Sequence, residues 1–252
     1  EVSTTQLPGV MGLFHNGQAY YLTKSEIFYI QGTGHGTFFP LPMKAKTGAQ
    51  SMRGALAVAG KGIYHTGPDG LYLFASGTDT KVTEESLEPL FRGEDSQGMA
   101  GVADMTTAIL WSYRNHLYFA YRSDGHAYPS NVLVMNLDTG RLAYYVYDDG
   151  DEVELTSVAT DIANNRLLVG DGTGFVRVIE NNLYDEDSDE PIEFEVQSKD
   201  FTLQTRRHFP HWVKYDIDAS QADECTGELL LAGTVHHTHT LNENRNTRRR
   251  LV

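Results

Sequence analysis

The sequence has little cysteine, a deficit of basic residues and no long apolar run. Cys225 is its only cysteine, so no disulfide can form within the chain and the packed core must hold the fold. The 20 Lys and Arg residues are outnumbered by 34 Asp and Glu residues, which gives a formal net charge of -14. This balance excludes a general nucleic-acid-binding surface, because such a surface needs clustered basic residues in excess. No segment approaches the roughly 20 apolar residues that cross a bilayer, so we expect no membrane-spanning segment.

Helical periodicity is also scarce. The best candidate is "VTEESLEPLFRG", residues 82–93, where Thr83 is positioned to cap a helix and Leu87, Leu90 and Phe91 fall on one helical face. Pro89 interrupts the segment and limits it to one or two turns of α-helix or 3₁₀-helix. The rest of the sequence is typical of short strands, and we predict an all-β fold.

Four segments share a layout of apolar strand, turn and second apolar strand. They begin at Gly17, Gly60, Arg114 and Asn164, which are 43, 54 and 50 residues apart. Turns such as "TGPDG" and "GDGTG" contain residues that tolerate positive φ, so we expect hairpins. A repeat of roughly 40 to 50 residues with several strands is typical of β-propeller blades. The alternative, a β-sandwich, would show turns every 8 to 12 residues or so without the longer period.

An acidic run, "NNLYDEDSDEP", interrupts this pattern. Like charges repel one another and Pro191 favours an extended backbone, so the run indicates a linker. After it, "IEFEVQSKDF", "HWVKYDIDA" and "GELLLAGTVHH" alternate apolar and polar residues with period two, which indicates antiparallel strands. We predict β-propeller-like blades in residues 1–182, an acidic linker in 183–190 and a small antiparallel β-sandwich-like module in 191–252. Both modules are expected to be incomplete, as in a segment of a longer polypeptide.

The acidic run also resembles the opening of a calcium-binding loop. Asp185, Asp187 and Asp189 alternate as the first ligands of such a loop do. Glu190 and Val196 stand where that loop requires glycine and a bidentate glutamate, so a solvated linker is the favoured interpretation.

His237 and His239 fall on one face of a predicted strand, and this spacing allows two imidazoles to bind the same metal ion. Copies of the strand in an oligomer could supply further ligands. A polar strand near a sheet edge is the favoured alternative, because the sequence offers no carboxylate or cysteine nearby to support the site. We therefore predict no resident metal and no cofactor.

Motifs that carry catalysis are missing from the sequence. It has no Gly-x-Ser-x-Gly elbow, no His-Glu-x-x-His helix and no Gly-Lys-Ser phosphate loop. No pair of carboxylates stands among apolar residues in two different repeats, as glycan cleavage requires. Cys225 stands among acidic residues that disfavour the thiolate, which makes it a poor nucleophile. We predict that the protein has no catalytic residue and is not an enzyme. Two alternative functions stay open: a glycan-binding or glycan-cleaving propeller of a phage or bacterium, and a cellular propeller that serves as a scaffold for protein partners.

The order of three phrases carries a family resemblance. They are "AYYLTKSEIFYIQG" from Ala19, "GHGTFFPLPMKAKTGAQSMRGALAVAGKGIYHTGPDGLYLF" from Gly34 and "SKDFTLQTRRHFPHWVKYDIDA" from Ser198. From roughly Gly12 to Ala219 the chain resembles the β-propeller proteins of bacteriophage tails, the nozzle or tail-tube-end components of short-tailed phages and their relatives. In that family, a "Ser/Thr-Lys-Asp-Phe" phrase opens a β-sandwich module after the blades.

The resemblance implies a non-enzymatic structural protein that is made in the host cytoplasm and located in the virion tail. Its partners would be copies of itself in a ring and other tail or portal-adapter proteins. Phage DNA would pass through the ring without specific binding, and a net negative charge suits such a conduit because it does not hold a polyanion.

Three basic residues are candidate interface residues. Lys199 opens the last of the three phrases, and Arg206 and Arg207 are predicted in a turn between two strands of the sandwich-like module. There the arginines would lie within reach of carboxylates of the linker or of a neighbouring subunit. We interpret these residues as contacts between domains or subunits rather than as a ligand site.

Overall fold

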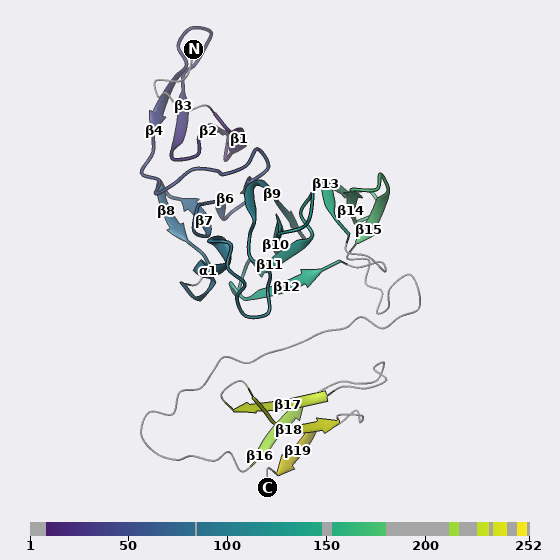
Figure 1. Cartoon of the computed structure of the whole chain (residues 1–252). Helices are drawn as coiled ribbons and strands as arrows, with labels where there is room; N and C mark the ends of the chain where they lie inside the picture. The colour runs from purple at the N-terminus through teal and green to yellow at the C-terminus, as the bar shows by residue number, and fades with distance from the viewer. Residues whose placement is uncertain are drawn as a thin grey trace, which may run out of the picture. The chain divides into compact units, whose positions relative to one another are not determined.

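The computed structural model describes most of the chain up to Ile179 and four strands beyond it. The described residues are 9–83, 85–147, 153–179, 212–216, 226–231, 234–240 and 246–250. They form strands with two short helical turns, so the prediction of an all-β fold is confirmed (Figure 1). The chain divides into two compact units, residues 1–183 and 184–252, and each is described by itself.

In its described residues, the first unit contains four successive antiparallel sheets, three of four strands and one of three. The first sheet contains β1 (Met11–His15), β2 (Gln18–Leu22), β3 (Ile27–Gln31) and β4 (Phe39–Pro42). The second sheet contains β5 (Ala55–Val58), β6 (Gly62–Thr66), β7 (Leu71–Ala75) and β8 (Thr78–Lys81). The third sheet contains β9 (Asp104–Tyr113), β10 (His116–Arg122), β11 (Asn131–Asn136) and β12 (Leu142–Val146). The fourth sheet contains β13 (Leu155–Asp161), β14 (Arg166–Asp171) and β15 (Val176–Ile179).

Within each of these sheets, every strand pairs with the next along the chain, and several of the connections are tight turns. Between β1 and β2, Asn16 and Gly17 both have positive φ, 49° and 75°. Two successive residues with positive φ are the mark of a type I′ turn, whose twist matches that of the flanking strands. All four segments predicted as hairpins contain adjacent paired strands.

The predicted helical segment forms a 3₁₀ turn, Glu85–Leu87, followed by α1 (Glu88–Phe91). Pro89 lies in the first turn of α1, where its missing N–H costs no hydrogen bond. The prediction that Thr83 caps the helix is wrong. The Thr83 hydroxyl instead accepts a hydrogen bond of 3.2 Å from the backbone N–H of Leu71, which joins β7 to the end of β8.

The four sheets follow one another with their first strands side by side. Strand β1 lies beside β5, β5 beside β9, and β9 beside β13. From its first strand, each sheet runs outward in chain order to its last strand. The segment before β5 ties the second sheet to the third: the Ser51 hydroxyl donates to the Ala108 carbonyl at 2.5 Å, and the Leu110 N–H donates to the Arg53 carbonyl at 2.8 Å.

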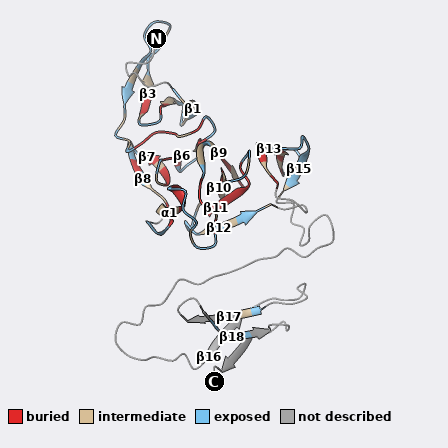
Figure 2. Cartoon of the chain, viewed as in Figure 1, coloured by how far each residue is buried: buried red, intermediate tan, exposed pale blue. Residues whose placement is uncertain are grey.

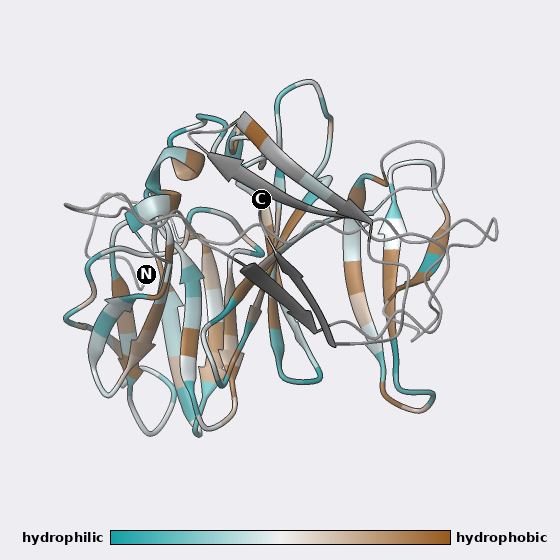
Figure 3. Cartoon of the chain, turned by 90° about the horizontal axis from the view of Figure 1, so that it is seen from below, coloured by the Kyte–Doolittle hydropathy of each residue, from teal (hydrophilic) through white to brown (hydrophobic). Residues whose placement is uncertain are grey.

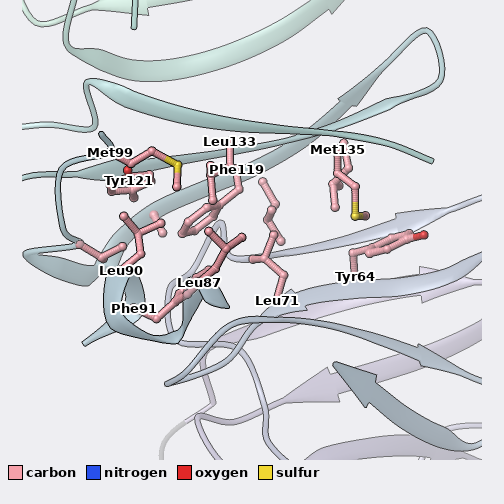
Figure 4. Close-up of a cluster of buried hydrophobic side chains, with 14 residues drawn as sticks. Tyr64, Leu71, Leu87, Leu90, Phe91, Met99, Phe119, Tyr121, Leu133 and Met135 are labelled. Carbon is pink, nitrogen blue, oxygen red and sulfur yellow. The ribbon is translucent and has the colours of Figure 1, made fainter. Parts of the chain in front are cut away.

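Three hydrophobic clusters lie between successive sheets. Between the first and second sheets, the buried residues are Leu22, Ile27, Ala49, Ala55, Ile63 and Phe74. The largest cluster joins the second and third sheets and also includes Leu87, Leu90 and Phe91 of the helical turns. Figure 4 shows Leu90 and Phe91 gathered with Phe119 and Tyr121 of β10 in this cluster. The third cluster joins the third and fourth sheets and includes Trp111, Tyr118, Leu155 and Val169.

The second and third sheets are consequently covered on both faces. In β10, Phe119 belongs to the cluster toward the second sheet, whereas Tyr118 and Ala120 belong to the cluster toward the fourth. A strand buried on both faces needs an unbroken apolar run, which explains "LYFAY" in β10. Figure 2 shows the contrast with β15, whose residues alternate between exposed and intermediate. Hydrophobic positions lie along the strands, and most connecting loops are hydrophilic (Figure 3).

The second unit contains two antiparallel strand pairs in its described part. Strand β16 (Trp212–Asp216) pairs with β19 (Asn246–Arg250), and β17 (Thr226–Leu231) pairs with β18 (Thr234–Thr240). The strands predicted in "HWVKYDIDA" and "GELLLAGTVHH" correspond to β16, β17 and the start of β18. The predicted linker, 183–190, and the strand predicted in "IEFEVQSKDF" lie outside the described residues.

The turn between β14 and β15 is organised by a buried carboxylate, that of Asp171. One of its oxygens accepts hydrogen bonds from the backbone N–H groups of Thr173 and Phe175, at 3.0 and 2.8 Å, and from the Thr173 hydroxyl at 2.7 Å. The other oxygen accepts from the Arg177 guanidinium at 2.8 Å. The Arg177 hydrogen bond, followed by those of the turn, holds the pKa of Asp171 well below its ordinary value of 3.8.

Replacing Asp171 with Ala is expected to lower the melting temperature of the chain by a few degrees at neutral pH. The pKa of Asp171 is lower in the folded state than in the unfolded state. The ionised carboxylate therefore stabilises the fold at pH values above its ordinary pKa, and this stabilisation is lost as the pH falls below about 4. The difference in melting temperature between wild type and variant should therefore shrink in acid, as measured by circular dichroism. Asp124→Ala, in an exposed turn, is the control. A difference that stays constant down to low pH would contradict the assignment.

Candidate functional site

The predicted interface residues and acidic cluster lie where the structure gives no description. Lys199, Arg206 and Arg207 are outside the described residues, as are the aspartates of the acidic linker. His237 and His239 lie in β18, paired in register with Leu229 and Gly227 of β17. Among the described residues, no group of three or more His, Cys, Asp or Glu side chains is arranged to hold a metal ion.

A histidine and a carboxylate face each other inside the second sheet. His65 comes from β6 and Asp79 from β8, and both side chains are completely buried. The Nε2 atom of His65 lies 3.0 Å from Asp79 Oδ1, and its Nδ1 atom lies 3.3 Å from the Gly48 carbonyl oxygen. The second carboxylate oxygen accepts hydrogen bonds from the backbone N–H groups of Lys46 and Thr47, at 3.0 and 3.4 Å.

The neighbouring strand extends these contacts toward the surface. The ring of Tyr72 stacks on that of His65 with a centroid distance of 5.6 Å, and its hydroxyl donates to Asp69 at 2.7 Å. Lys81 then bridges Asp69 and Glu88, with nitrogen–oxygen distances of 3.0 and 2.6 Å. Burial, followed by the hydrogen bond to Asp69, raises the pKa of Tyr72 above its ordinary value. Burial alone would lower the pKa of Lys81, but the hydrogen bonds to Glu88 and Asp69 outweigh it and raise that pKa.

A histidine beside a buried aspartate is also the arrangement of a general base, but the geometry here does not serve that role. A general base needs one ring nitrogen free to reach the proton that it abstracts. Both ring nitrogens of His65 already face protein oxygens, and neither His65 nor Asp79 is exposed. The pair therefore cross-links β6, β8 and the segment before β5 and leaves no nitrogen for a substrate.

The stack of sheets has an apolar outer face at its beginning. In the first sheet, Met11, Leu13 and Tyr20 face the second sheet, so their alternate neighbours face away from it. The strand register places Phe14 beside Ala19 and Tyr21 beside Phe28 on this outer face. Its positions are Gly12, Phe14, Ala19, Tyr21, Phe28, Ile30, Pro40 and Pro42, and we term them the first end face.

The other end of the stack has the same character. In the fourth sheet, Leu167 and Val169 pack toward the third sheet, and the positions between and around them face outward. These positions are Ser157, Ala159, Asp161, Arg166, Leu168, Gly170, Val176 and Val178, and we term them the last end face. The first end face contains no Asp, Glu, Lys or Arg, whereas the last end face contains Asp161 and Arg166, which lie opposite each other in the register of β13 and β14. Phe14 is 76% exposed and Val176 is 72% exposed. Phe28, also on the first end face, is only 5% exposed. Exposed apolar side chains gathered on one face of a sheet are typical of interaction sites.

Sequence reasoning missed both features. The signal for the buried pair was a histidine in the otherwise apolar strand "GIYHTG", because a buried imidazole needs a polar partner. The signal for the first end face was an apolar residue at most positions of β1, β2 and β3, because a sheet buried on one face only would carry polar residues at alternate positions. The strands of the fourth sheet contain several polar residues and carry no such signal.

Comparison with known proteins gives only weak likenesses. No protein-family model matches the sequence, and a comparison with curated proteins finds no match. Among solved structures, the chain is similar to the computationally designed Ika4 protein, with 12% identity and a TM-score of 0.38 over 71% of this chain and 94% of that one. It is also similar to the extracellular domain of a one component system from B. thetaiotaomicron, with 10% identity and a TM-score of 0.39 over 79% of this chain and 23% of that one.

A third similar structure is Hsv2 of Kluyvelomyces marxianus, with 9% identity and a TM-score of 0.23 over 98% of this chain and all of that one, 100%. Likenesses with TM-scores this low carry no argument about function. In the described part of the chain, no helix has the length and apolar character needed to cross a membrane.

Proposed function

We propose that this chain is a structural component of a bacteriophage virion tail that forms part of a symmetric ring or nozzle around the DNA exit channel. The observation that carries the proposal is the order of the four sheets. Each is an antiparallel meander, their first strands lie side by side, and apolar clusters fill the space between neighbours. Blades of a β-propeller are arranged in this way about an axis.

The finer architecture belongs to the same proposal. The four sheets are blades, with their first strands nearest the axis, and residues 191–252 form a β-sandwich-like module. The strand pairs β16–β19 and β17–β18 support such a module because antiparallel pairs are the units from which sandwiches are built.

The polar interior of the second sheet favours a structural role over a catalytic one. The His65–Asp79 pair is closed to substrates, and its contacts join separate strands. A scaffold needs such cross-links, whereas an enzyme needs polar groups that converge on an open cleft. The proposal therefore assigns no catalytic residue and no cofactor.

The proposed partners are copies of the chain in a ring and other tail or portal-adapter proteins, with the virion tail as the location after synthesis in the host cytoplasm. Lys199, Arg206 and Arg207 are proposed contacts with the linker or a neighbouring subunit. A net charge of -14 supports a channel that DNA passes without specific binding, because like charges do not adhere.

Immunoelectron microscopy of virions tests the proposal. Antibodies raised against this chain are expected to label the tail end of intact particles in a symmetric pattern and to leave tailless heads unlabelled. Purified virions that lack the chain would contradict the proposal. Hydrolysis or saturable binding of a polysaccharide by the purified chain would instead favour the glycan-directed alternative.

A further inference from the structure

We infer that the last end face of one copy docks on the first end face of a second copy, so that successive chains continue one row of sheets. This head-to-tail contact rests on the proposed function for its partner, a second copy of this chain. The structure supplies the two surfaces.

The contact continues an interface that the chain already contains three times. Each sheet packs an apolar face on the next sheet, with first strands side by side, from the first sheet through to the fourth. Among the described residues of the first unit, no further sheet packs on the first end face or on the last end face. A second copy offers the missing half in the same orientation as the internal interfaces.

The two end faces also differ in a way that favours pairing with each other. The first end face presents large flat groups, among them Phe14, Tyr21 and the rings of Pro40 and Pro42. Apart from Leu168 and the Asp161–Arg166 pair at its edge, the last end face presents small residues, among them Ala159, Gly170 and Val178. Large side chains against small ones fill space without overlap, whereas a pairing of two first end faces would oppose ring to ring.

The two faces are mainly apolar, and their charged residues, Asp161 and Arg166, pair with each other in register at one edge of the last end face. Docking removes both faces from water, which favours the apolar groups but is costly for a charge that lacks a partner. Phe14 and Val176 are exposed and gain most from being covered. A contact between two different faces repeats from copy to copy, and it closes into a ring when the rotation allows.

Two charged variants of the full chain test the contact. Phe14→Glu places a carboxylate on the first end face, and Val176→Lys places an ammonium group on the last end face. Either change is expected to weaken self-association at least about tenfold, because every head-to-tail contact then buries one unpaired charge. Met52→Glu and Met52→Lys are the matched controls: Met52 is 77% exposed and belongs to neither end face. Sedimentation velocity measures the assembly state, and circular dichroism verifies that each variant is folded.

Mixing the two variants distinguishes this arrangement from others. Phe14→Glu keeps an intact last end face, and Val176→Lys keeps an intact first end face, so one good contact can form between them. The mixture is expected to yield a heterodimer by native mass spectrometry, although each variant alone is monomeric. A symmetric contact between two first end faces would instead leave Val176→Lys associated and Phe14→Glu monomeric.

Three results would overturn the inference: a wild-type chain that stays monomeric at all concentrations, self-association that neither charge weakens, or the symmetric pattern just described. A wild-type chain that stays monomeric and binds a different tail protein through these faces would also overturn the inference. These failures leave the proposed function standing if the chain is found in the virion tail. Conversely, if the chain associates head to tail but is absent from virions, the contact is supported and the proposed function is contradicted.

Discussion

Replacing Phe119 with Ala is expected to lower the free energy of unfolding of the first unit by about 3–5 kcal/mol. Phe119 is completely buried in β10, and its ring stacks on those of Phe91 and Tyr121 with centroid distances of 5.7 and 5.4 Å. Truncation removes the transfer free energy of the ring and also leaves a cavity. Since the third sheet is covered on both faces, the surrounding side chains have little freedom to fill that cavity.

The measurement is urea-induced unfolding followed by tryptophan fluorescence in a Trp212→Phe background. Trp111, in the third sheet, is then the only tryptophan and reports on the first unit alone. Phe38→Ala is the matched control, because it deletes the same ring from a position that is 57% exposed and belongs to neither end face, and it should change the free energy by less than about 0.5 kcal/mol. Equal effects of the two substitutions would mean that the third sheet is not enclosed by its neighbours.

The hairpins could be predicted from the sequence because their information is local. Turn residues such as Asn16 and Gly17 determine where one strand ends and the next begins, and the flanking apolar residues determine which segments are buried. The first strand of each sheet was harder to recognise: β9 begins with Asp104, and Thr106 and Thr107 follow before its apolar part. Strand β4 carries Pro40 and Pro42, which only an edge strand tolerates.

The stacking of the sheets could not be derived from the same local information. Whether the apolar run of β10 is enclosed by one sheet or by two depends on segments as far away as Leu71 and Leu155. The repeat length pointed to blades, and the structure adds the order of the interfaces between sheets. Lys199, Arg206 and Arg207 stay predictions, since they lie outside the described residues.

The buried polar pair illustrates the same limit. The sequence places His65 in an apolar strand and Asp79 fourteen residues later in a short polar one. Their contact exists because β6, β7 and β8 pair in register, which brings both side chains to the same face of the sheet. Turn chemistry predicts the hairpin, but the choice of partner for a buried imidazole depends on the three-dimensional register.

Replacing Asp79 with Ala is expected to lower the free energy of unfolding by about 3–5 kcal/mol, the cost of breaking a buried pair by removing one partner. The change leaves His65 Nε2 and the backbone N–H groups of Lys46 and Thr47 facing a cavity without an acceptor. Unfolding is followed through Trp111 as above. Asp138→Ala is the control, because its ion pair with Lys61 is exposed and should shift the midpoint much less.

A double-mutant cycle separates the pair from the backbone contacts. His65→Leu removes the imidazole, so the double variant with Asp79→Ala has no unpaired imidazole and should be more stable than the sum of the single effects predicts. Strict additivity would mean that the pair contributes nothing and that the carboxylate acts only through Lys46 and Thr47. Non-additivity would show that the second sheet is held together by a polar contact between its strands as well as by the apolar clusters on its two faces.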